Sequence, residues 1–322
     1  MYVAIHRRNG NHGILSNWWH RNLRHKYCNV EEEQETGRIM KMTKRMVSVC
    51  FVFVFLFFLG IMDYPFVSRL INQRNYDGVI IEYDDTSAKL DANRKEQFFK
   101  EAKQYNEELS NGSGISIIDA FAQDHSMEKK YTQLLNVANN GVMGVVDIPK
   151  LHVSLPIYHG TSEEVLQKGA GHLEGTSLPI GGISTHACLS AHRGLPNKKM
   201  FTSLDELKKG DIFLITVLGR KMAYKVNNIQ IVLPSDIKAL HIQKGKDLVT
   251  LITCTPYGVN SHRLYVTGER TEYKEEMKTD NSIGLPWYYD WWWVPVNIVL
   301  LSVLGILLYQ YNRKPKVKEK VE

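Results

Sequence analysis

Two long apolar segments stand out from the mixed pattern of the chain, one near each end. Residues 46–62 form a run of 17 without a charged side chain, and residues 291–308 form a second run of 18. Runs of this length are typical of helices that cross a membrane, and Asn297 and Pro295 weaken the second run only slightly. We therefore predict transmembrane helices over residues 46–62 and 291–311.

Basic residues beside both apolar segments predict how the chain is oriented. Lys41, Lys44 and Arg45 precede the first segment, and residues 312–322 form a basic tail after the second. Because basic flanks stay on the cytoplasmic side, we expect both termini inside the cell and residues 63–290 outside. A cleaved signal peptide is the alternative for the first segment, but that segment is long for one and lacks a small-x-small cleavage site.

Residues 1–45 form a cytoplasmic N-terminal extension in this scheme. The first 40 residues mix both charges and show no clean hydrophobic period, whereas Met40 or Met42 would begin a more usual basic-then-apolar anchor. We therefore expect the piece upstream of these methionines to be an extension and not a folded unit.

The exterior region begins with helical patterns. Residues 91–111 are rich in helix-forming side chains and end at Asn-Gly-Ser-Gly, which stops a helix. A second helix is predicted after Ser126 and continues to Gly141, and the stretch 113–125 between the two helices is irregular and partly apolar. Residues 63–141 are therefore predicted to be a helical region that contains one long loop.

From Val142 the pattern changes to short β-rich runs bounded by Gly, Pro, Asn and Asp. Gly219-Arg220 is typical of a tight hairpin between two of these runs. Few long helices alternate with the strands, which argues against a doubly wound parallel sheet. We predict a mainly β fold, with a closed or nearly closed β-barrel over residues 142–275 and a linker over residues 276–290.

Two short helical inserts are predicted inside the β region. Thr161 with Glu164, and Ser203 with Glu206, have the spacing of a capping box at a helix N-terminus. We expect one short helix to begin at each of these pairs.

Composition narrows the choice of partners. The 322-residue chain is 43% hydrophobic and 23% charged, which suits a globular domain with some membrane content. Its net charge is +6, but much of the excess lies near the two ends, beside the apolar segments. Because this placement reflects membrane orientation, we expect a lipid bilayer and no nucleic acid among the partners.

Four cysteines offer little support for a metal site or a disulfide framework. Cys28 lies in the polar N-terminal region and Cys50 inside an apolar segment, and no Cys-x-x-Cys pair or Cys/His metal spacing occurs. A disulfide between Cys188 and Cys254 is possible on count alone. Two reduced thiols are the favoured interpretation.

Cys254 is the first candidate for chemistry. It ends an apolar run that begins at Asp247, and Pro256 then turns the chain, so the thiol is predicted at the end of an interior strand. A cysteine in an apolar strand is usually an inert core residue, so this position alone does not indicate a nucleophile. Cys188 is the competing nucleophile, but it lies in the middle of its run.

Arg263 follows nine residues after Cys254, at the start of the next β-rich run. If the two runs pair as a hairpin, the guanidinium lies near the thiol, where it lowers the thiol pKa and stabilises an oxyanion. The alternative is an arginine that only neutralises an acid at a strand end.

His192 is the candidate acid/base. It closes a run of small residues and precedes a Gly and a Pro, so it is predicted where a strand becomes a loop. His186, at the other end of that run, and His262, beside Arg263, are the alternatives.

At this point the residues resemble a known family. The stretch 250–270, TLITCTPYGVNSHRLYVTGER, resembles the sortase signature, in which a strand ends in the nucleophilic cysteine and an arginine follows on the next strand. The short spacing, together with LPIYHGTSEEVLQKG and STHACLSAHRGLP, resembles class C, the pilin-polymerising sortases. The resemblance runs from about residue 142 to 270.

The resemblance implies a fold and a set of site residues. It implies an eight-stranded sortase barrel in which Cys254, His192 and Arg263 are the catalytic trio. Class C sortases also carry a lid with an Asp-Pro-aromatic motif, and here Asp119 and Phe121 flank an alanine in place of that proline. The alternative for this stretch is an ordinary loop with one buried Phe.

The resemblance also implies an activity. The family cleaves LPXTG-like sorting signals between Thr and Gly through a thioacyl enzyme, and class C passes the acyl group to a lysine of the next pilin, without a metal or organic cofactor. A sortase that anchors proteins to the cell wall through a peptidoglycan-precursor amine is one alternative. A non-enzymatic, membrane-tethered β-domain is another.

Overall fold

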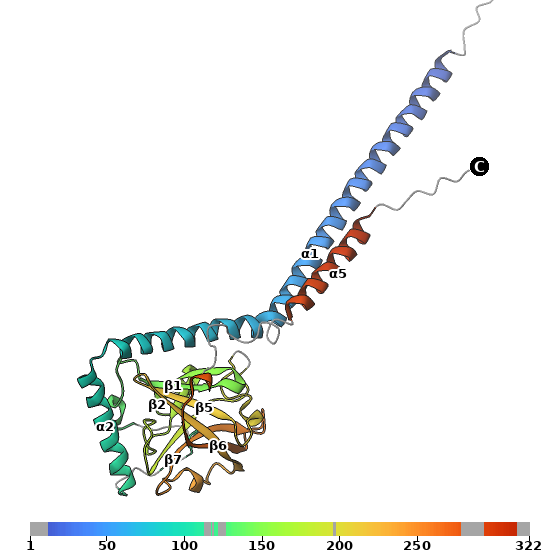
Figure 1. The fold of residues 1–322 in the computed structure, drawn as a ribbon. Coiled ribbons are helices and arrows are strands. Elements are labelled where there is room, and N and C mark those ends of the chain that lie inside the picture. The colour runs from blue at the N-terminus through green and yellow to red at the C-terminus, as the bar shows by residue number, and fades with distance from the viewer. Residues whose placement is uncertain are drawn as a thin grey trace, which may run out of the picture. The chain divides into compact units, whose positions relative to one another are not determined.

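Eight strands close into a barrel in the computed structural model, which describes residues 12–112, 117, 119–121, 127–195, 198–277 and 293–313 (Figure 1). The strands are β1 (Val142–Ile148), β2 (Val153–His159), β3 (Ala170–His172), β4 (Thr185–Ser190), β5 (Ile212–Val217), β6 (Arg220–Val232), β7 (Asp247–Thr255) and β8 (His262–Thr271). Their order around the barrel is β1-β2-β3-β4-β7-β8-β6-β5. The predicted fold class is confirmed.

Strand β7 shows how the sequence alternation builds two layers of packing. Val249 and Leu251 belong to the main apolar cluster of the barrel. Ile252, on the opposite face of the strand, packs instead in a smaller cluster with Cys188 and Tyr265. Both faces are buried because successive strand side chains point to opposite sides and each side meets apolar partners.

The helices and short 3₁₀ turns frame this barrel. The α-helices are α1 (His12–Lys89), α2 (Ala92–Ser110), α3 (Glu163–Lys168) and α5 (Trp293–Asn312). The 3₁₀ turns are η1 (Tyr131–Gln133), η2 (Pro149–Leu151), η3 (Leu204–Glu206), η4 (Lys238–Leu240) and η5 (Glu275–Met277). Helix α2 lies where the sequence predicted it, and the Asp91 carboxylate caps it by accepting a hydrogen bond from the Arg94 backbone N–H at 2.7 Å.

The predicted second helix before Gly141 is wrong. Only η1 is helical in that stretch, and Leu135 and Asn139 adopt left-handed backbone conformations that end any longer helix. The segment is held by tertiary contacts instead, since Tyr131 and Leu135 are fully buried in the main apolar cluster. Burial of these side chains overrides the local helix propensity.

Three other expectations need correction. Helix α3 is capped by Ser162 and not by Thr161, because the Ser162 side chain accepts from the Val165 backbone N–H. At the second insert, Ser203 makes no capping hydrogen bond and the helix is a single 3₁₀ turn. Residues 12–40, which the sequence did not predict to be regular, lie within α1. The predicted linker 276–290 lies outside the described residues except for its first two.

The described chain divides into two units, residues 1–62 with 293–322, and residues 63–292. In the first unit, the Asn312 side-chain amide donates to the Ser48 hydroxyl at 3.4 Å, and the Lys44 ammonium lies 6.0 Å from the centre of the Tyr311 ring. These contacts join the start of the first apolar segment to the end of the second.

Two helical segments are long and apolar enough to cross a membrane, Gln34–Lys89 of α1 and Trp293–Asn312 of α5. The first contains the apolar run 46–62, and the second overlaps the run 291–308. Their length and composition support association with a membrane.

A buried histidine network holds the segment that contains η1 against the barrel. The Nε2–H of His172 donates to the Ser177 carbonyl oxygen at 2.8 Å, which leaves Nδ1 as the acceptor for the Tyr131 hydroxyl, also at 2.8 Å. His172 is fully buried, and burial lowers its pKa to about 4. The ring is therefore neutral at physiological pH, and protonation would remove the acceptor that Tyr131 uses.

This network predicts an acid-labile fold. Because the folded pKa of His172 lies below the unfolded value near 6.5, its contribution to stability is complete above about pH 6.5 and is lost as the pH falls toward 4. Over that window the loss amounts to roughly 3 kcal/mol. Urea unfolding of the full-length protein at pH 4.5 and 7.5 should show a smaller pH difference for His172→Gln than for the wild type. The control is His152→Asn, which replaces an exposed histidine and should keep the wild-type difference in unfolding free energy between the two pH values. The same difference in His172→Gln as in the wild type would show that His172 is not the source of the acid lability.

Candidate active site

Cys254 and Arg263 lie directly opposite each other on neighbouring strands. The antiparallel register of β7 and β8 pairs Cys254 with Arg263 and Thr255 with His262. Paired residues of this kind have Cβ atoms about 5 Å apart and side chains on the same face of the sheet. The hairpin predicted from the sequence is confirmed, and it places the thiol beside the guanidinium.

His192 comes from the strand on the other side of β7. The parallel register of β4 and β7 pairs Ser190 with Ile252, and beyond the end of β4 the Ala191 backbone N–H donates to the Ile252 carbonyl oxygen at 3.1 Å. The Thr253 hydroxyl donates in turn to the Ala191 carbonyl oxygen at 2.8 Å. Since two more residues along each strand lead to His192 and Cys254, the shared register brings the imidazole to the edge of the strand that carries the thiol.

The guanidinium of Arg263 is held by an acid from a distant part of the chain. Its Nε–H and an Nη2–H donate to the two carboxylate oxygens of Asp119, at 2.8 and 2.7 Å. Its Nη1 donates to the backbone carbonyls of Asn260 and His262, at 3.1 and 3.2 Å. The arginine therefore does neutralise an acid, as one interpretation of the sequence expected, while it also faces Cys254.

Phe121 contacts both Arg263 and His192. The Arg263 guanidinium lies 5.0 Å from the centre of the Phe121 ring, and the ring centres of Phe121 and His192 are 6.0 Å apart. Ala120, between Asp119 and Phe121, is buried in the cluster that contains Ile252. Of the loop 113–125, residues 117 and 119–121 are described. Residues 119–121 lie against Arg263, His192 and the face of β7 that carries Ile252.

The thiol of Cys254 is reduced and 8% exposed. Burial raises its pKa, the positive charge of Arg263 lowers it, and the negative charge of Asp119 raises it. The Asp119 carboxylate therefore offsets the effect of the arginine on the thiolate. Burial is the largest of these three effects, and the Asp119 charge acts in the same direction, so the pKa of the thiol is raised overall.

Sequence reasoning missed Glu163, which lies at the N-terminus of helix α3. Its Oε1 is 3.2 Å from Nε2 of His192. The hydrogen bond from the Gln167 side chain lowers the pKa of the Glu163 carboxyl most, and the contact with His192 lowers it further. Only the acidic first turn of the predicted insert hinted at it, because nothing in the local pattern connects α3 with the end of β4.

Comparisons with known proteins agree with this geometry. The family model of the sortase domain matches residues 146–271. The crystal structure of sortase C-1 from Actinomyces oris is 46% identical, and the match covers 56% of this chain and 99% of that chain with a TM-score of 0.52. The chain belongs to the sortase family.

Two further relatives locate this sortase within the family. The crystal structure of Streptococcus pneumoniae sortase C is 43% identical, and the match covers 62% of this chain and 98% of that chain with a TM-score of 0.58. Sortase D of Bacillus subtilis is 28% identical over 180 residues, which are 55% of this chain and 84% of that protein. The recognition as a class C sortase is confirmed, and the chain is an enzyme of a cysteine transpeptidase family.

The alternative candidates of the sequence have other roles in this sortase. Cys188 is fully buried, and burial raises the pKa of its thiol far above the ordinary value. His186 is also buried, with Nδ1 at 3.0 Å from the His241 carbonyl oxygen and Nε2 at 2.7 Å from the Thr250 hydroxyl. His262 contacts the neighbouring Ser261 hydroxyl at 2.9 Å. Cys188 and Cys254 are both free thiols, so the disulfide that their count allowed is absent.

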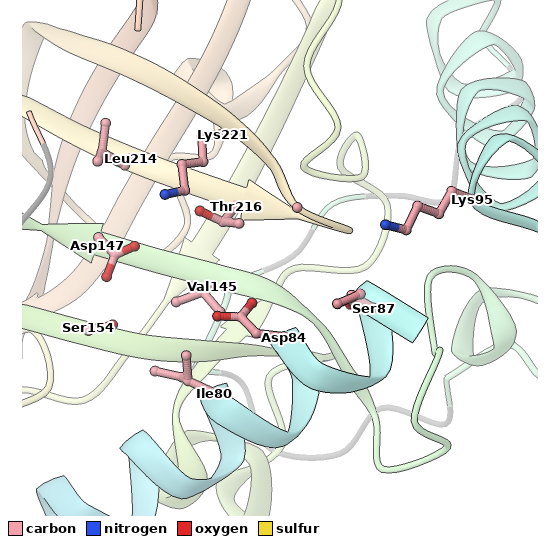
Figure 2. Close-up of a pocket in the computed structure, with 12 residues that line it drawn as sticks. Ile80, Asp84, Ser87, Lys95, Val145, Asp147, Ser154, Leu214, Thr216 and Lys221 are labelled. Carbon is pink, nitrogen blue, oxygen red and sulfur yellow. The ribbon is translucent and has the colours of Figure 1, made fainter. Parts of the chain in front are cut away.

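Two further features of the described residues bear on where the site lies. Within the described residues, no group of three or more His, Cys, Asp or Glu side chains could hold a metal ion. A cavity of about 380 Å³ lies instead between α1 and the β1–β5 side of the sortase barrel (Figure 2). Asp84, Asp147 and Lys221 line it, and β1 and β5 are far from β7 in the barrel order. The cavity is therefore not part of the candidate active site.

The Asp119–Arg263 ion pair predicts the reactivity of the thiol. Replacing Asp119 with Ala removes a charge that raises the Cys254 pKa and frees the guanidinium that lowers it, so more thiolate should form at pH 7.5. Alkylation of full-length protein by iodoacetamide, followed by mass mapping of the Cys254 peptide, should speed up by up to about tenfold for each unit by which the pKa falls.

The control for this measurement is Asp77→Ala, which removes an exposed carboxylate on α1 that accepts a hydrogen bond from Gln73 at 3.0 Å. Its alkylation rate should equal that of the wild type. An unchanged rate in Asp119→Ala would show that the ion pair does not govern the thiol.

Proposed function

We propose that this sortase is a membrane-tethered pilin polymerase that cuts an LPXTG-like sorting signal between Thr and Gly and joins the Thr carbonyl to a pilin lysine. The single observation that carries this proposal is the convergence of Cys254, Arg263 and the end of the His192 strand on three adjacent strands, beneath a segment that contacts two of the three. The pilus-related titles of the similar structures, such as "Pilus-related Sortase C of Group B Streptococcus", support the pilin substrate class.

The first half-reaction forms a thioester. The Cys254 thiolate attacks the Thr carbonyl carbon, and the carbonyl oxygen becomes an oxyanion beside the Arg263 guanidinium. As the C–N bond breaks, His192 in its imidazolium form gives its proton to the departing Gly amine. The products are a thioacyl enzyme, a free Gly amine and a neutral imidazole.

The second half-reaction forms the isopeptide bond. The lysine amine of the next subunit attacks the thioester carbonyl, and neutral His192 takes the proton that the amine loses. The C–S bond then breaks and returns the Cys254 thiolate. His192 is again protonated, so the pair is ready for another cycle and no cofactor is consumed.

Access to the thiol requires the Asp119–Arg263 ion pair to open. The guanidinium has to exchange the Asp119 carboxylate for the oxyanion of the substrate, since the Asp119 contacts use both its Nε and Nη2 donors. Phe121 has to leave the His192 ring at the same time, because the two rings pack together. The segment 119–121 would thus act as a lid whose negative charge occupies the anion site.

The membrane segments would hold the catalytic barrel beside the membrane. Two spanning helices with both basic flanks in the cytoplasm would hold residues 63–290 outside the cell, next to the membrane. A pilin waiting there on its own C-terminal anchor would share that surface, which raises the effective concentration of both partners.

The proposed chemistry predicts a clean separation of the two central cysteines. Full-length protein incubated with a sorting-signal peptide should form an acyl adduct whose mass maps to Cys254. Cys254→Ala should abolish the adduct, and Cys188→Ala should leave it intact, because the buried Cys188 lies in the smaller apolar cluster. An adduct that survives in Cys254→Ala, or that disappears only in Cys188→Ala, would reassign the nucleophile.

Purified pilin separates polymerisation from anchoring. Ladders of covalent pilin oligomers are expected from wild-type enzyme, linked through a lysine. A product formed only with a peptidoglycan-precursor amine would favour a cell-wall-anchoring sortase, and a Cys254 that forms no adduct at all would favour a non-enzymatic binding domain.

A further inference from the structure

Arg193, the residue after His192, links the turn that follows β4 to strand β7 and to η3. Its Nη1–H donates to the Thr255 hydroxyl at 3.2 Å, and its Nη2–H donates to the Asp205 carboxylate at 2.5 Å. Thr255 directly follows Cys254 on β7, and Asp205 lies in η3. The Arg193 side chain is only 9% exposed, whereas the Asp205 side chain is half exposed.

Hydrogen bonds hold the residues on both sides of Arg193, His192 and Gly194, in place. The His192 carbonyl oxygen accepts from the Phe201 backbone N–H at 3.1 Å, and the Gly194 N–H donates to the Thr202 hydroxyl at 3.2 Å. Gly194 has a φ of +83°, and a Cβ there would approach the Tyr257 ring to 3.1 Å. The turn therefore packs closely on the segment that follows Cys254, and only glycine fits at this point.

The chemistry of the guanidinium suits this bridging position. A planar fork can hold a carboxylate on one arm and a hydroxyl on the other, whereas a lysine ammonium at the same place is a single point charge. The Nε of Arg193 is buried and has no hydrogen-bond partner among the described residues. Leaving a buried donor unpaired costs stability, so the arginine is not the residue that packing alone would choose.

We infer that Arg193 is a positioning residue that locks the His192 turn to the end of strand β7 and thereby fixes the imidazole relative to the Cys254 sulfur. This inference rests on the proposed function. His192 has to reach the leaving amine and then the attacking amine, and a misplacement of about 1 Å in such a site costs on the order of a hundredfold in rate. Asp205 holds the guanidinium in turn, as the outer support of the same clamp.

The test is the steady-state kinetics of full-length protein in detergent micelles with a fluorogenic LPXTG peptide. Arg193→Met should lower kcat by between about tenfold and a hundredfold, while KM changes less than about twofold, because the proposed mechanism gives Arg193 no contact with the peptide. Arg193→Lys should recover part of kcat, since the ammonium can reach Asp205 but cannot also hold Thr255. Its melting temperature should match that of the wild type.

A double-mutant cycle separates a clamp from a merely structural role. Asp205→Asn should lower kcat in the wild-type background but have little further effect in Arg193→Met, because the two residues act through one contact. The matched control is Arg220→Met, which removes an arginine that stacks on Phe99 with 4.0 Å between guanidinium and ring centre. Its kcat should be unchanged.

Two outcomes would overturn the inference. The first is an equal kcat in Arg193→Met and the wild type. The second is that the effects of the Arg193 and Asp205 changes on kcat are additive and parallel their effects on the melting temperature. Failure of the proposed function is distinguishable, because the wild type would then form no acyl adduct on Cys254. Failure of this inference alone leaves both the adduct and the peptide activity intact in Arg193→Met.

Discussion

The paired hydrogen bonds between Arg263 and Asp119 are the interaction on which the state of this site depends. They join a loop that precedes the barrel to the strand residue opposite Cys254, across 144 residues of sequence. Charge-assisted bonds of this bidentate kind are strong and directional, and both side chains are mostly buried. The same contact sets the charge near the thiol, holds Phe121 against the His192 ring and occupies the donors that an oxyanion would need.

The barrel explains why three separate strand ends meet at one place. Strand β7 has β4 as a parallel neighbour on one side and β8 as an antiparallel neighbour on the other. The end of β7 therefore lies next to the end of β4 and the beginning of β8, so Arg263 lies opposite Cys254 and His192 follows the neighbouring strand end. A register shift of one residue in either pair would turn a side chain to the opposite face, so the apolar alternation that fixes the register also fixes the site.

Much of this arrangement could be predicted from local patterns. The β-rich runs, the closed barrel, helix α2 and the pairing of Cys254 with Arg263 follow from alternation, turn residues and short loop length, which act over a few neighbours. The segment before Gly141 could not be predicted, because buried tertiary contacts of Tyr131 and Leu135 override a helix-forming sequence. The contacts of Glu163 with His192, and of Arg193 with Asp205 and Thr255, were also missed, since they join elements whose proximity appears only after the barrel closes.

We expect Arg263 to exchange the Asp119 carboxylate for the carbonyl oxygen of the substrate. A crystal structure of the enzyme carrying a covalent sorting-signal mimic on the sulfur of residue Cys254 tests it most directly. We expect the guanidinium to lie within hydrogen-bonding distance, about 3 Å, of the mimic's oxygen, with Asp119 and Phe121 displaced. An intact ion pair beside a bound mimic, with the oxygen facing other donors, would contradict the claim.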